Sequence, residues 1–157
     1  MRFPTLLRRA IAASALLALM TACTSELEAK MTPEESRQVF ITEAKAIIQA
    51  VFPGADPLVV VQVRDAPCGG PVGTDFSSVE SMINVHSDAR DEKLDPDHVF
   101  KQVIEVLKQQ GWKINYTKDR IAGAEREGVG GISAGVGDSP VGINIGGDTE
   151  CVENPEK

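Results

Sequence analysis

The stretch FSSVESMINVHS, residues 76–87, decides the fold class. Its residues fall into two alternating sets, one running from Val79 to Ser87 and the other from Glu80 to His86. Alternation with a period of two is typical of a β-strand that buries one face. One of the two sets must therefore face a layer of helices, and the sequence on either side of this strand predicts such helices.

The flanking helices are predicted from their first turns and their apolar spacing. Thr32-Pro33-Glu34-Glu35 opens the first helix with a cap, a proline and a capping-box glutamate, and Pro53-Gly54 ends it. Asp95-Pro96-Asp97 opens the second helix in the same way, and Gly111 stops it. The expected buried faces are Phe40, Ala44, Ile47, Ile48 and Val51 in the first helix, and Phe100, Val103, Ile104 and Leu107 in the second.

Five further segments predict strands. Residues 58–64 (LVVVQVR) precede the deciding strand and are joined to it by a Pro/Gly loop, residues 66–74. Residues 112–117, 121–127, 129–136 and 141–145 follow the second helix, and Gly137-Asp138-Ser139 predicts a hairpin turn. The order α-β-β-α-β-β-β-β has no repeating strand–helix–strand unit. We therefore expect an α+β fold, with two helices packed on one face of an antiparallel sheet.

The composition limits the classes of partner. Aromatic residues make up 4% of the 157 residues, so we expect an aliphatic core. The formal net charge is −7, and it becomes −10 without residues 1–22, which carry Arg2, Arg8, Arg9 and no acid. Such acidity disfavours binding to nucleic acid and to anionic lipid headgroups. Attachment to a membrane would therefore need something other than charge.

The first 22 residues predict a bacterial lipoprotein signal peptide. A basic head is followed by the apolar run 10–20, which is too short to span a bilayer and has the length of a signal-peptide core. Leu19-Met20-Thr21-Ala22-Cys23 resembles a lipobox, although Met20 replaces the usual Leu. The resemblance implies that Cys23 becomes the lipidated N-terminus and that two or more acyl chains hold it at the membrane. The alternative is an ordinary cleaved signal peptide. Residues 23–32 are expected to be a tether, 33–151 a single domain and 152–157 a loose tail.

The three cysteines allow one disulfide if the first of them is lipidated. If Cys23 is acylated, Cys68 and Cys151 are the only partners for a disulfide in an exported domain. Each follows a predicted strand, and the bridge would close a loop of about 84 residues. A metal site built on these cysteines is the alternative, but they lack CxxC spacing. We expect no cofactor and no metal.

The layout resembles small actinobacterial cell-envelope lipoproteins of the LppA type. The features that carry the resemblance are Cys23, a first helix, Cys68, a second helix ending at Gly111, and the closing run 142–151 (GINIGGDTEC). The resemblance covers most of the mature chain. It implies the fold, and it brings no biochemical activity with it.

Catalytic motifs are present only in fragments. Residues 131–135 (GISAG) match the G-x-S-x-G elbow of serine hydrolases, but no helix follows, and both His86 and His98 precede Ser133. The glycines between Gly128 and Gly147 are followed by no phosphate-binding Lys-Ser/Thr, so they indicate strands and turns, with a shallow ligand groove as the alternative.

Other polar clusters have structural explanations. The acids near residues 88–98 fit helix capping and a solvated loop rather than a calcium loop, with a weak divalent site as the alternative. Trp112 and Tyr116 are interpreted as core or half-core residues rather than a ligand platform. The acids in question are Asp88, Asp91, Glu92, Asp95 and Asp97.

The sequence thus predicts a non-enzymatic lipoprotein, anchored at the extracytoplasmic face of the cell membrane. Its domain would bind an unknown protein or a small hydrophobic ligand. An envelope hydrolase that uses Ser133 and a purely structural surface protein are the competing hypotheses.

Overall fold

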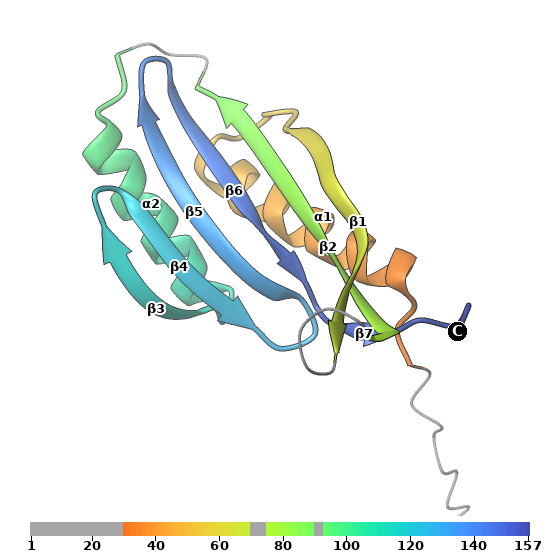
Figure 1. Cartoon of the computed structure of the whole chain (residues 1–157). Helices are drawn as coiled ribbons and strands as arrows, with labels where there is room; N and C mark the ends of the chain where they lie inside the picture. Colours follow the sequence, from red (N-terminus) through yellow and green to blue (C-terminus); the bar gives the residue numbers. More distant parts are fainter. Residues whose placement is uncertain (1–29, 70–74, 90–92) are drawn as a thin grey trace, which may run out of the picture.

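A computed structural model describes residues 30–69, 75–89 and 93–157. Two helices lie behind one antiparallel sheet, and within these ranges no helix lies on the near face of the sheet (Figure 1). The expected α+β fold is therefore confirmed. The elements are α1 (Pro33–Val51), β1 (Leu58–Gly69), β2 (Asp75–Asp88), α2 (Pro96–Gln109), β3 (Lys113–Lys118), β4 (Ile121–Arg126), β5 (Gly130–Asp138), β6 (Val141–Thr149) and β7 (Val152–Glu153).

The strand order across the sheet is β1-β2-β6-β5-β4-β3, and β7 pairs with the start of β2. The C-terminal hairpin of β5 and β6 thus inserts between the two halves of the sheet. On β2, Val79, Ser81, Ile83 and Val85 are buried against the helices, which settles the question left open by the alternation. The core is aliphatic apart from Phe40 and Trp112.

The helix ends follow the expected chemistry. Thr32 Oγ1 accepts from the Glu35 amide at 3.2 Å, and the Glu35 carboxylate accepts from the Thr32 amide at 2.8 Å, which completes the capping box. At the end of α2, Gly111 has φ +79°, and the Trp112 amide donates to the Leu107 carbonyl at 2.9 Å. This Schellman arrangement satisfies carbonyls that a helix end leaves free.

Two predictions about side-chain environment were partly wrong. The buried face of α2 is centred on Val99, Val103 and Leu107, whereas Phe100 and Ile104 are only half-buried. Trp112 is buried, but Tyr116 is 52% exposed because it lies on the face of the sheet that no helix covers. The helical period was correct in α2, and the centre of its buried face was set by packing against the sheet.

Three boundaries also differ from the prediction. The strand expected to end at Arg64 continues to Gly69, so Cys68 lies within β1 rather than in a loop. Irregular pairing near Asp65 lets the strand continue, and Pro67 is tolerated because β1 is an edge strand. The expected loose tail begins with β7, where Val152 is 9% exposed. The hairpin turn lies at Ser139-Pro140, because Gly137 and Asp138, expected in the turn, still belong to β5.

Candidate binding site

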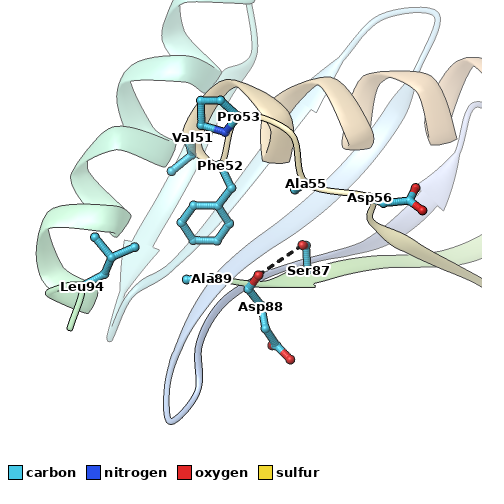
Figure 2. Close-up of a pocket in the computed structure, with 9 residues that line it drawn as sticks. All are labelled: Val51, Phe52, Pro53, Ala55, Asp56, Ser87, Asp88, Ala89 and Leu94. Atoms are coloured by element: carbon cyan, nitrogen blue, oxygen red, sulfur yellow. Dashed lines mark hydrogen bonds between the residues drawn. The ribbon is translucent and has the colours of Figure 1, made fainter. Parts of the chain in front are cut away.

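An apolar cleft lies where the end of α1, the end of β2 and the start of α2 meet (Figure 2). Its volume is about 480 Å³, which is within the range of small-molecule sites. The ring of Phe52 points from the end of α1 toward Ala89 and Leu94 (Figure 2). The lining residues are Val51, Phe52, Pro53, Ala55, Asp56, Ser87, Asp88, Ala89 and Leu94.

Local sequence holds each wall of the cleft in place. The Phe52 amide donates to the Ile48 carbonyl at 2.7 Å, and the chain then turns at Gly54, whose φ of +78° suits glycine. The Ala89 amide donates to the Val141 carbonyl at 2.7 Å and so extends the sheet to the cleft floor. Asp95 caps α2 by accepting from the Asp97 amide at 3.0 Å.

The cleft combines an apolar interior with an acidic mouth. Exposed Asp56 lies at its rim, and the Ser87 hydroxyl donates to the Asp88 carbonyl at 3.4 Å (Figure 2), whereas the Asp88 carboxylate lies against Gly142 on the other face of the sheet. None of the nine lining residues is a lysine, an arginine or a histidine. Such a site suits an apolar ligand that is neutral or positively charged, since a negative ligand would be repelled at the rim.

No protein-family model, curated protein or solved structure matches this chain. The geometry of the described residues therefore carries the functional argument.

Ser133 lies in the middle of β5, on the uncovered face of the sheet. Its cross-strand neighbours are Gly123 and Gly146, and β5 continues to Asp138 and into the β6 hairpin. A nucleophile elbow requires a strand, a sharp turn and then a helix, and this local order is absent at Ser133. Among the described residues, no base is hydrogen-bonded to its hydroxyl.

The two histidines lie on different elements. His86 is on β2, facing away from the helices and paired with Asn144, whereas His98 is exposed in the first turn of α2. Within the described ranges, no group of three or more His, Cys, Asp or Glu side chains is arranged to hold a metal ion. Asp97 pairs with Arg120 at 3.5 Å, and Asp91 and Glu92 lie outside the described residues.

In the described part of the chain, the cysteines pair as the sequence predicts. Cys68 and Cys151 form a disulfide with a sequence separation of 83 residues, which confirms the expected pair. Cys23 and the signal peptide lie outside the described residues. Within the described part, no helix is both long and apolar enough to cross a membrane.

The cleft was not predicted from the sequence. Phe52, Ala89 and Leu94 come from three separate connections, and none belongs to a motif. One signal was available, since Phe52 continues the apolar repeat of α1 to the residue directly before Pro53-Gly54, where the helix must end. A large apolar residue at a helix end often packs on the next element, but the sequence does not show which element that is.

Proposed function

We propose that this protein is an extracytoplasmic lipoprotein, anchored by acyl chains at Cys23, whose domain binds a small apolar ligand in the cleft beside Phe52. The single observation that supports the binding role is the cleft itself, with its apolar interior and acidic rim. The lipobox at residues 19–23 supports the anchor.

The position of the cleft suits a tethered binding module. The described chain starts at Lys30, next to the first turn of α1, and the cleft lies at the other end of that helix. A helix of 19 residues is roughly 28 Å long, so the two ends of the domain are well separated. A domain held at Cys23 would present the cleft away from the membrane surface.

Binding is tested with the neutral fluorophore N-phenyl-1-naphthylamine and the unlipidated mature chain, residues 23–157 carrying Cys23→Ala. We expect saturable enhancement at one site per chain. Ala89→Phe fills the cleft and should weaken binding about tenfold or more. Ser133→Phe adds the same ring to the opposite face of the sheet and should leave binding unchanged. No saturable enhancement, or equal binding by the Ala89→Phe chain, would contradict the binding role.

The anchor is tested separately by fractionation of cells that express the full chain. Wild-type protein should sediment with membranes, and Cys23→Ala should abolish acylation and release the chain from them. Ser25→Ala, two residues away, is the matched control and should remain membrane-bound. If the Cys23→Ala chain still sediments wholly with membranes, anchoring through this thiol is wrong.

A further inference from the structure

The uncovered face of the sheet, which carries Ser133, has few side chains along its two central strands, β5 and β6. Along β5 and β6, each cross-strand pair on this face contains at least one glycine, so at least one member of each pair has no side chain. The pairs are Gly131 with Asp148, Ser133 with Gly146, Gly135 with Asn144, and Gly137 with Gly142.

Apolar side chains flank these two central strands on both sides. They are 41–58% exposed, and on each strand pair they share the face that carries Ser133. The ring of Tyr116 packs against Gly123, and a Cβ added to that glycine would lie 2.0 Å from a ring carbon. The flanking residues are Leu58, Val60, Val63 and Met82 on β1 and β2, and Tyr116 and Ile121 on β3 and β4.

Charge is divided across the same face. Its β2 and β6 half carries three acids, Glu80, Asp88 and Asp148. The opposite half carries Lys113 and Lys118 on β3; Lys113 is paired with Glu125 at 2.8 Å, and Lys118 lies 3.9 Å from Asp119 in the following turn. A face with acids on one half and bases on the other can complement a rotated copy of itself.

We propose that this face binds a second copy of the same chain, about a twofold axis that runs parallel to the strands between β5 and β6. This rotation places β5 of one copy over β6 of the other. Asp148, Ser133 and Asn144 of each copy then face the partner's Gly131, Gly146 and Gly135, so each side chain meets a position without one. β3 of each copy then lies over β1 of the other, so that Lys113 and Lys118 are one strand away from the acids of β2.

The tether is compatible with this symmetry. An axis parallel to the strands keeps Lys30, where the described chain starts, at the same end in both copies. Two domains anchored at Cys23 in one membrane can therefore associate face to face, in the manner of aligned packed sheets.

The size of the face indicates a weak dimer. Five strand spacings of about 4.8 Å and about six residues of 3.3 Å give a footprint of roughly 500 Å² per copy. Two such footprints reach only about 1,000 Å², the lower limit for a specific interface. Anchoring in one membrane raises the effective concentration of the partner and favours such a contact.

The test is cross-linking of the full chain in the membranes of its host with a short bismaleimide. Ser133→Cys places a thiol beside the axis and should yield a species of twice the chain mass. Lys101→Cys, exposed on α2 behind the sheet, should not yield it. No dimer above the Lys101→Cys level, or products containing a different protein, would overturn the proposal.

A second substitution separates the interface from the fold. A Cβ at Gly131 meets nothing within 4 Å, so Gly131→Leu fits the single chain but blocks the position facing Asp148 of the second copy. Added to Ser133→Cys, it should abolish the dimer while the melting temperature of the domain is retained. Gln109→Leu, which adds the same side chain on α2, should leave the dimer intact. Persistence of the dimer with Gly131→Leu would refute this arrangement.

Discussion

The guanidinium of Arg37 in α1 is buried and donates a hydrogen bond to the carboxylate of Asp65 in β1. Only 7% of the Arg37 side chain is exposed, against 39% for Asp65. Arg37 also donates to Glu34 at 2.7 Å and to the Ser81 hydroxyl at 3.4 Å. Asp65 has φ +54° at the irregular part of β1. One buried cation therefore links the first turn of α1 to the point where the edge strand bends.

Removal of the Asp65 carboxylate should destabilise the fold. We expect Asp65→Ala to lower the free energy of unfolding by about 2 kcal/mol, because it removes an acceptor from a charged donor and places alanine at positive φ. Asp65→Asn should cost less, since asparagine keeps an acceptor and tolerates this backbone conformation. Urea unfolding of both variants measures the difference, and an equal loss in both would show that the acceptor contributes nothing.

Glu80 should make the stability depend on pH. Burial raises the pKa of the Glu80 carboxyl, and the nearby Asp148 carboxylate raises that pKa further. The folded state therefore holds the proton more tightly than the unfolded state. This contribution to stability is complete below the ordinary pKa of 4.5 and is lost as the pH rises through the raised value.

Replacement of this carboxyl tests that sign. Glu80→Gln should raise the melting temperature at neutral pH, and the gain should disappear below about pH 4. Glu105→Gln, on the exposed side of α2, provides a charge-matched control and should change little. Thermal unfolding followed by circular dichroism at the two pH values measures both variants. A larger rise in the melting temperature of the Glu80→Gln variant at acidic pH would contradict the predicted sign.

The Cys68–Cys151 bridge should contribute strongly to stability. It closes a loop with a sequence separation of 83 residues, and its loss should cost roughly 4 kcal/mol by the chain-entropy model. The double variant Cys68→Ser/Cys151→Ser should therefore unfold at much lower urea concentration. Intact mass before and after reduction with alkylation confirms the bridge independently. Two thiols that react under native, non-reducing conditions would contradict it.

Gly111 should be needed for its backbone conformation alone. Its φ is +79° and a Cβ there would meet nothing within 4 Å, so Gly111→Ala adds strain without a clash. We expect a loss of about 1 kcal/mol in the free energy of unfolding. Gly131→Ala is the control, because that position is equally open and has no positive φ. Similar losses at the two positions would indicate that something other than φ is responsible.

Most of the local structure could be predicted because it depends on near neighbours. The capping box at Thr32, the proline and aspartate opening α2, and the glycine ending it act within a few residues, and all three occur as expected. The pairing of Cys68 with Cys151 could be predicted because the chain has three cysteines and the first was assigned to the lipid. The alternation in residues 76–87 predicted a half-buried strand, and β2 is that strand.

The predictions that failed depend on distant segments. Cys68 lies in a strand because β2 continues to pair with β1 past Asp65, and β7 exists because Val152 is buried beside Val79. Tyr116 is exposed because the helices cover only the other face of the sheet. None of these partners can be identified from the residues next to them in the sequence.

The amino-acid sequence by itself determined the type and ends of the helices, the alternation of the strands and the disulfide pair, whereas lipidation of Cys23 stays a prediction. Only the tertiary structure decided that β6 lies between β2 and β5, that Phe52 meets Ala89 and Leu94 in a cleft, and that the glycines of β5 and β6 lie side by side. The reason is physical: periodicity and capping arise from contacts within one or two turns, whereas strand order and clefts arise from packing between segments far apart along the chain.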